Sequence, residues 1–123
     1  MAQKMEQMSE EMEQCILNCL DCYRICLEMI NYCLEQGGLF AAPGPIRRLL
    51  DCAEICQTSA GFLIRHSDLH PRICGACAEV CEACAAECAQ FSDDDQMAAC
   101  ADICRRCAAS CRKMAEGHKR AAA

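Results

Sequence analysis

Residues 74–88 read CGACAEVCEACAAEC and place five cysteines at positions 74, 77, 81, 84 and 88. The steps between them alternate between three and four residues. This spacing brings side chains onto one face of an α-helix, where they pack against a partner element. The stretch therefore predicts a helix whose buried face consists of thiols.

Working outward from this stretch, the same periodicity predicts helices over residues 4–36, 45–66, 69–91 and 93–117. The breaks between them are GGLFAAPG, SDLHP and SDDD. Pro45 and Pro71 suit the first turn of a helix, and Ser92 with Asp95 has the spacing of a capping box. No segment alternates like a strand. Four helices with short connections predict an all-α fold, an antiparallel up-down-up-down four-helix bundle with a Cys-lined core, formed as a single domain by residues 1–123.

Soft-metal ligands occupy the axis of this predicted bundle, because all 16 cysteines fall on the inward-facing seams. Ordinary aliphatic residues such as Ile16, Leu20 and Leu34 lie off the seam. Buried cysteine is often only a small hydrophobe, and cross-helix disulfides are a second structural explanation. A core of Cys packs less well than one of Leu, so stability alone does not explain the choice.

Composition and charge exclude several classes of function. The net charge is −6 and aromatic residues make up 4%, which leaves no basic patch or stacking platform for nucleic acid. No apolar run is long enough to span a membrane. The first residues, MAQKMEQMSEEMEQC, lack the apolar core and cleavage site of a signal peptide. We therefore expect a cytoplasmic protein with no nucleic-acid or membrane partner, in a compartment that keeps thiols reduced.

The helical ladder of thiols favours copper(I) over other metals. Zinc sites are closed tetrahedra of four ligands, and iron–sulfur cysteines lie on loops with a different spacing. Copper(I) is selected by thiolates and thioethers, and two or three sulfurs satisfy it. Each Cys-x-x-x-Cys pair could hold one ion between its sulfurs, which predicts many ions per chain. The candidate metal ligands are Cys15, Cys19, Cys22, Cys26, Cys33, Cys52, Cys56, Cys74, Cys77, Cys81, Cys84, Cys88, Cys100, Cys104, Cys107 and Cys111.

A further set of ligands is predicted at one end of the bundle. The topology brings together the start of the first helix, the end of the second, the start of the third and the end of the fourth. These segments carry thioethers and imidazoles at Met5, Met8, Met12, His66, His70, Met114 and His118. A thioether binds copper(I) without losing a proton, so this end could receive the ion and pass it inward. Methionine there can equally be packing, and histidine can cap carbonyls.

The segments CILNCLDCYRIC, CAEIC, CGACAEVCEACAAEC and CADICRRCAASC resemble the bacterial copper storage proteins, four-helix bundles with cysteine-filled cores. The resemblance covers nearly the whole chain. It implies a non-enzymatic protein that stores many Cu(I) ions on core thiolates, assembles as a homotetramer, and belongs to the branch without an export leader. It leaves open whether a copper chaperone or copper enzyme receives the metal, or whether the protein only detoxifies copper. Ser59 and Leu63 depart from the pattern, because they stand at seam positions that could have been cysteine.

Three other functions remain as alternatives. A metallothionein-like zinc or cadmium buffer would bind fewer ions, because those metals prefer four thiolates. A thiol redox protein would need a reactive pair, and Cys74 with Cys77 lies near a predicted helix start. A metal-responsive regulator would need a DNA-reading element, which the sequence does not show.

Overall fold

The computed structural model of the chain describes the backbone of residues 2–122 and the side chains of residues 10–117. It contains the helices α1 (Ala2–Gln36), α2 (Pro43–Ile64), α3 (His70–Ala89) and α4 (Asp95–Ala122), with a short 3-10 helix η1 (Gly38–Ala41) between α1 and α2. No strand occurs in residues 2–122. The predicted all-α fold is confirmed.

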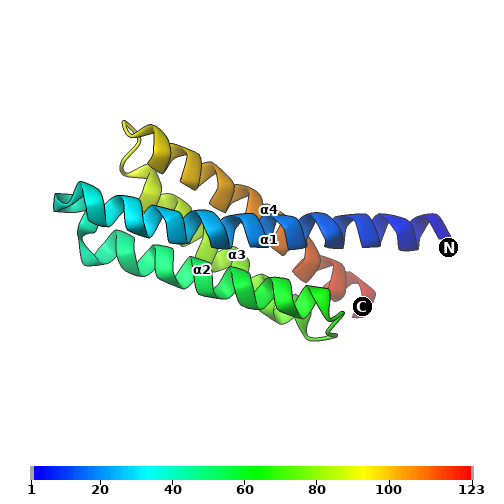
Figure 1. Cartoon of the computed structure of the whole chain (residues 1–123). Coiled ribbons are helices and arrows are strands. Elements are labelled where there is room, and N and C mark those ends of the chain that lie inside the picture. Colours follow the sequence, from blue (N-terminus) through cyan, green and yellow to red (C-terminus); the bar gives the residue numbers. More distant parts are fainter. Residues whose placement is uncertain (1, 123) are drawn as a thin grey trace.

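The four helices form a ring in which each packs against two neighbours. Helix α1 lies against α2 and α4, and α3 lies against α2 and α4 (Figure 1). Among the described residues the diagonal pairs make no close backbone contact, so side chains fill the axis. The start of α1, the α2–α3 turn and the end of α4 lie at one end, which we call the α2–α3 end (Figure 1). The η1 segment and the α3–α4 connection lie at the other, the α3–α4 end. This is the predicted up-down-up-down bundle.

Helix boundaries differ from the predicted ones where local turn chemistry decides them. Helix α2 begins at Pro43, so this proline rather than Pro45 opens its first turn. The helix stops at Ile64 rather than at residue 66, because His66 adopts the left-handed conformation with a φ of 56°. The N–H of Ser67 then donates to the carbonyl of Phe62 at 3.0 Å and closes the helix end.

The start of α4 is capped by Asp94, and the predicted capping box of Ser92 and Asp95 is wrong. One carboxylate oxygen of Asp94 accepts the backbone N–H of Met97 at 3.0 Å. The other accepts the hydroxyl of Tyr32, on α1, at 2.6 Å. This contact from another helix selects Asp94 as the cap, and a local sequence pattern does not contain it.

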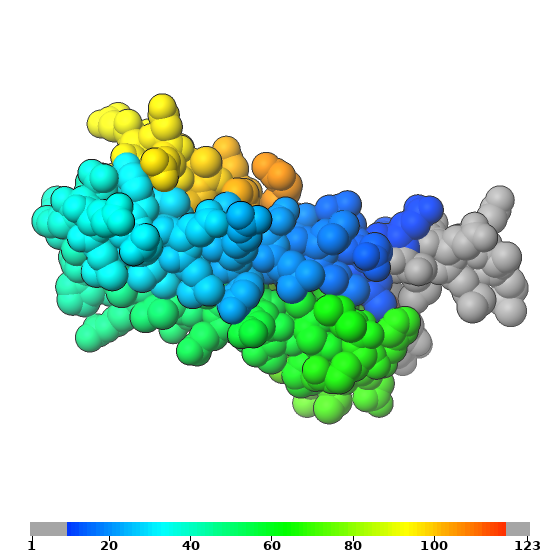
Figure 2. Space-filling model, viewed as in Figure 1, coloured from blue at the N-terminus to red at the C-terminus, as the bar shows by residue number. Residues whose placement is uncertain are grey.

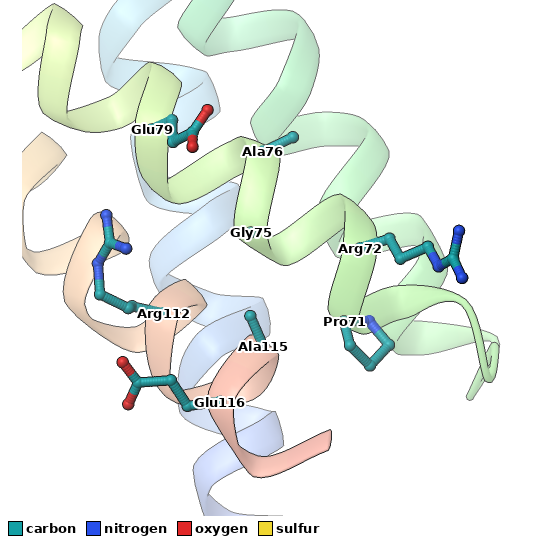
Figure 3. A pocket seen from close by; sticks show the side chains of 8 residues that line it. All are labelled: Pro71, Arg72, Gly75, Ala76, Glu79, Arg112, Ala115 and Glu116. Atoms are coloured by element: carbon teal, nitrogen blue, oxygen red, sulfur yellow. The ribbon is translucent and has the colours of Figure 1, made fainter. Parts of the chain in front are cut away.

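Small side chains let the backbones of α3 and α4 approach closely. Ala78, Ala85, Ala101 and Ala108 are all at most 3% exposed. Further toward the α2–α3 end, a Cβ placed on Gly75 would lie 3.8 Å from that of Ala115. A groove of the outer surface lies along these two helices there, and Figure 3 shows its lining of small and charged side chains. The groove is thus a surface feature, separate from the axis that carries the thiols.

Candidate metal centre

All four helices contribute cysteines to the bundle axis. Each of the 16 cysteines is at most 1% exposed, and each is a free thiol. Helix α1 supplies Cys15, Cys19, Cys22, Cys26 and Cys33; α2 supplies Cys52 and Cys56; α3 supplies Cys74, Cys77, Cys81, Cys84 and Cys88; and α4 supplies Cys100, Cys104, Cys107 and Cys111. The predicted thiol-lined core is therefore present. A Cys side chain has less apolar surface than Leu, so each such position gives up on the order of 1 kcal/mol of burial energy.

The shortest sulfur–sulfur contacts join different helices. The Sγ atoms of Cys19 and Cys111 are 3.6 Å apart, as are those of Cys22 and Cys52. The predicted intrahelical pairs contribute fewer short contacts, such as Cys77 to Cys81 at 3.8 Å. Cysteines of adjacent helices interleave at the axis, whereas one turn of helix separates cysteines of the same helix. The four-sulfur ligand sets therefore combine one predicted Cys-x-x-x-Cys pair with thiols of other helices. These separations are well above the roughly 2.05 Å of a disulfide bond.

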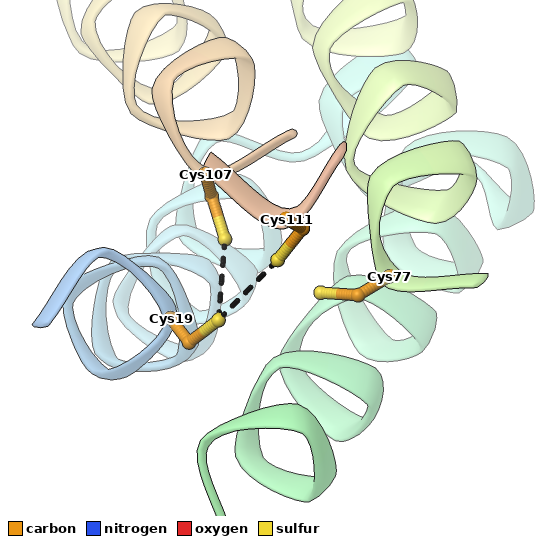
Figure 4. Close-up of side chains that lie close together, drawn as sticks. All are labelled: Cys19, Cys77, Cys107 and Cys111. Carbon is orange, nitrogen blue, oxygen red and sulfur yellow. Dashed lines mark hydrogen bonds between the residues drawn. The ribbon is translucent and has the colours of Figure 1, made fainter. Parts of the chain in front are cut away.

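Five groups of thiols have their sulfur atoms within 4.8 Å of one another. Figure 4 shows one of them, in which Cys19, Cys77, Cys107 and Cys111 converge from α1, α3 and α4. The other groups are Cys22, Cys26, Cys52 and Cys104; Cys22, Cys52, Cys56 and Cys81; Cys56, Cys77, Cys81 and Cys107; and Cys15, Cys74 and Cys111. Neighbouring groups share sulfurs, so they form a continuous series along the axis.

Cys56 lies at the centre of this series. Its Sγ lies 4.0 Å from Cys52, 3.6 Å from Cys81 and 3.8 Å from both Cys77 and Cys107. These partners come from α2, α3 and α4. A metal-bound thiolate here could bridge ions in more than one group.

Four cysteines lie outside these compact groups, toward the α3–α4 end: Cys33, Cys84, Cys88 and Cys100. There the thiol of Cys33 donates to the thioether sulfur of Met97 at 3.7 Å. Met97 is fully buried. It was not among the candidate ligands from the sequence, although its seam position was the available signal. The predicted thiol ladder is thus less compact at this end.

Of the predicted thioether and imidazole ligands, some lie beside the thiol core and one is exposed to solvent. Met114 is buried at 9% exposure and Met12 is partly buried against the thiol core. The Nδ1 atom of His70 lies 4.0 Å from the sulfur of Cys74. His66 is exposed on the α2–α3 turn, so it does not continue the buried seam. The side chains of Met5, Met8 and His118 lie outside the described residues.

Burial and thiol–thiol hydrogen bonds govern protonation of the core. Burial raises the pKa of the Cys33 thiol, and the nearby thiols of Cys100 and Cys84 add to the effect. The hydrogen bond with Cys107 raises the pKa of Cys56 strongly. The hydrogen bond with Cys104 instead lowers the pKa of Cys52 to about 7. Because buried charges repel each other at these distances, we expect the metal-free axis to hold mainly neutral thiols.

Several solved structures are similar to this chain in both sequence and fold. A crystal structure of a protein from Nitrosospira multiformis is 46% identical, has a TM-score of 0.83, and matches over 88% of this chain and 97% of that one. The Cu(I)-bound copper storage protein 3 of Bacillus subtilis is 38% identical with a TM-score of 0.80, over 85% and 98% of the two chains. The copper storage protein of Streptomyces lividans, loaded with 10 copper equivalents, is 32% identical with a TM-score of 0.77, over 88% and 86%.

A curated relative is similar over a shorter region. It is an uncharacterized cysteine-rich protein of Bacillus subtilis, YhjQ, and it is 40% identical over 55 residues. The aligned region is 45% of this chain and 51% of the relative, so the chain spans about half the length of the curated relative that it matches.

The sequence profile of one family, described as copper storage protein, matches residues 8–116. This range includes all 16 cysteines and most of all four helices. The profile match, the bundle and its thiol-filled axis agree, and the chain belongs to the copper storage protein family.

Proposed function

We propose that this protein stores Cu(I) by binding many ions on the thiolates of its bundle axis. The observation that carries the proposal is the continuous series of buried thiol groups that share sulfurs. A thiolate that bridges two ions lets adjacent sites fill without a separate ligand set for each. The Streptomyces neighbour loaded with 10 copper equivalents supports a capacity of this order. All the cysteines, including those outside the compact groups, are the proposed ligands.

Charge balance favours Cu(I) over Zn(II) in this axis. One monovalent ion per thiolate gives a neutral core, which lowers the cost of burying the charges. Sites of two or three sulfurs satisfy Cu(I), whereas Zn(II) takes four ligands in a closed tetrahedron. The proposed role is therefore storage of Cu(I) without catalysis. The proposed location is the cytoplasm, and the proposed exchange partner is a copper chaperone or a copper enzyme. No helix in the described part of the chain is long and apolar enough to cross a membrane.

Metal competition distinguishes copper storage from the alternative functions. The reduced protein is equilibrated without oxygen with buffered Cu(I) and buffered Zn(II), and the bound metals are counted per chain. We expect Cu(I) to displace Zn(II) and to reach on the order of ten ions or more. Preferential binding of a few Zn(II) ions would indicate a zinc buffer. Catalysed disulfide exchange by the metal-free protein, with little copper uptake, would indicate a redox protein.

The α2–α3 end is the proposed site where copper enters and leaves. Met12 and Met114 lie beside the thiol core, and His70 lies within 4.0 Å of a core sulfur. A thioether can receive Cu(I) without releasing a proton, so it suits transient binding. Met5, Met8 and His118 belong to the same proposal by their sequence positions, and His66 lies on the adjacent turn.

An apolar face on α1 and α2 supports assembly into a homo-oligomer. Asn18 donates to Ser110 of α4 at 3.2 Å, so the opposite flank of α1 lies toward α2. That flank carries Leu20, Leu27 and Leu34, which are between 41% and 56% exposed. Leu50 of α2 is 44% exposed. Figure 2 shows α1 and α2 side by side on one broad face. A second copy of the chain would cover such a face, and a homotetramer is the proposed assembly.

A further inference from the structure

We propose that Cys15, Cys74 and Cys111 form a Cu(I) exchange site at the α2–α3 end of the thiol series, and that Ser59 stabilises its copper-bound form through a hydrogen bond to Cys74. This inference rests on the proposed storage function and names the group through which copper is exchanged. Ser59 acts as a positioning residue, because its partner is a ligand sulfur rather than the metal.

The group has three sulfurs where each of the other compact groups has four. Its cysteines come from α1, α3 and α4 and are fully buried. The sulfurs of Cys15 and Cys111 are 3.7 Å apart. The group lies nearest the α2–α3 end, because Cys74 is in the second turn of α3 and Cys111 is toward the end of α4. Three sulfurs match the coordination that Cu(I) accepts and fall short of a zinc tetrahedron.

Ser59 occupies the place on α2 that faces this group. It stands three residues after Cys56 on the buried face and is 0% exposed. Its hydroxyl oxygen lies 3.5 Å from the sulfur of Cys74. A buried hydroxyl needs a hydrogen-bond partner, and this thiol is the partner that the structure provides. The seam position of Ser59 therefore has a chemical role that a hydrophobic residue would not supply.

The hydrogen bond favours the copper-bound state over the metal-free state. In the metal-free protein either the hydroxyl or the thiol can donate. When Cu(I) replaces the thiol proton, the sulfur of Cys74 has only lone pairs, so Ser59 donates. A hydrogen bond to a sulfur with negative charge is stronger than one to a neutral thiol. Ser59 thus stabilises the negative charge on the sulfur of Cys74 when copper is bound.

Cys111 connects this site to the interior, because it also belongs to the group of Cys19, Cys77 and Cys107. Its sulfur lies 3.6 Å from that of Cys19. Copper held by Cys74 and Cys111 can bind the sulfur of Cys19 while it leaves that of Cys74. In the net exchange Cys19 loses its thiol proton and Cys74 gains one, and copper stays in the +1 state throughout. Release follows the reverse exchange.

The test compares Ser59→Ala with wild type and with Ser110→Ala under oxygen-free conditions. Ser110 is the control, because its hydroxyl donates to the backbone carbonyl of Cys107 at 3.1 Å and accepts from Asn18 at 3.2 Å, so its hydrogen bonds involve no sulfur. Each reduced protein is titrated with Cu(I) against a series of chelators, and transfer to an excess of chelator is followed in time. Circular dichroism checks that each variant is folded. Cys74→Ala serves as a second variant that removes the ligand itself.

We expect the total copper uptake of Ser59→Ala to stay within about one ion of wild type. The ion held by Cys15, Cys74 and Cys111 should bind about tenfold more weakly in this variant. Cys74→Ala should lose the same ion and slow the loading of the others, while Ser110→Ala matches wild type. The proposal is overturned if folded Ser59→Ala has wild-type affinity and exchange rates. It is also overturned if all ions are weakened equally, which would indicate a general packing defect. If wild type itself takes up no copper, the storage function fails instead.

Discussion

At the scale of single residues, the thiols of the axis are not equivalent. Cys56 contacts thiols of three helices, whereas Cys33 has a thioether partner and lies outside the compact groups. The number of sulfurs near a thiol sets how many ions its loss affects. The number of neighbouring sulfurs therefore predicts the loss of copper capacity on substitution better than burial does, because Cys56 and Cys33 are equally buried.

Replacing Cys56 by serine should lower copper capacity more than the same change at Cys33. Cys56→Ser removes a shared ligand from two groups, so we expect a loss of about two or more ions. Cys33→Ser should remove about one at most. Bound copper per chain, counted by elemental analysis after removal of excess metal, measures both. Equal losses from the two variants would contradict the central position of Cys56.

Asp94 should make the stability of the fold depend on pH at the acidic end. The hydrogen bonds from the Tyr32 hydroxyl and from the N–H of Met97 lower the pKa of Asp94 in the folded state. Its stabilising contribution is therefore complete above the unfolded pKa of about 4 and is lost as the pH falls through the lower folded value. Asp94→Asn keeps a capping side chain and loses this charge.

The free energy of unfolding of Asp94→Asn, measured by denaturant titration, should be lower than that of wild type at neutral pH. The difference should shrink below pH about 4, where protonation neutralises the wild-type carboxylate. A difference that stays constant with pH would show that the charge of Asp94 contributes nothing.

At the scale of the helices, periodicity predicted the buried faces well. Each helix packs against two neighbours around a common axis, so it must bury one stripe of side chains. The 3–4 spacing placed all the cysteines on the axis, as the structure has them. Helix ends were less predictable. Asp94 depends on Tyr32 of another helix, and the stop at Ile64 depends on a left-handed His66. The first is a contact with a distant part of the chain, and the second is a backbone conformation that a non-glycine residue rarely adopts.

The candidate site was predictable in its ligand type and in part of its grouping, because each four-sulfur group contains one predicted Cys-x-x-x-Cys pair. Spacing along one helix suggested pairs such as Cys15 with Cys19, whereas the structure places Cys15 and Cys19 each within 3.7 Å of Cys111. Cross-helix contacts depend on the axial register of neighbouring helices, and the sequence does not state that register. The contact of Ser59 with Cys74 was missed for the same reason.

The α2–α3 end should control the rate of copper loading but not the capacity. Replacing Met12 and Met114 together by leucine removes thioethers while keeping apolar volume, so the fold should persist. We expect slower uptake from a Cu(I) chelator in stopped-flow measurements, with nearly the same final number of ions. Met29→Leu is a matched control, because Met29 is a buried methionine of α1 away from this end. An unchanged rate in the double variant would reject the role of these thioethers.

At the scale of the whole molecule, the bundle combines a polarizable interior with exposed leucines on the outer surfaces of α1 and α2. The axis gives up burial energy to thiols, so assembly of several chains offers a compensating source of stability. The exposed leucines of α1 and α2 are the surface that this assembly would bury.

Replacing Leu20 and Leu27 by glutamate should dissociate the proposed oligomer. Like charges brought together across a symmetric interface repel, and the apolar contact is lost. Light scattering coupled to size-exclusion chromatography should show a larger species for wild type and a smaller one for the variant. Glutamate in place of Ala109, an exposed residue of α4 outside this leucine face, is the control and should leave the mass unchanged. A monomeric wild type would contradict the proposed assembly.

Storage of Cu(I) on the bundle axis is tested most directly by an oxygen-free titration of the reduced protein with Cu(I) against a competing chelator, with free thiols counted in parallel. We expect tight uptake on the order of ten ions or more, about one proton released per thiol consumed, and the loss of nearly all reactive thiols. Saturation at one or two ions, with most of the thiols still reactive, would contradict this expectation and would make the thiol-filled axis a packing core.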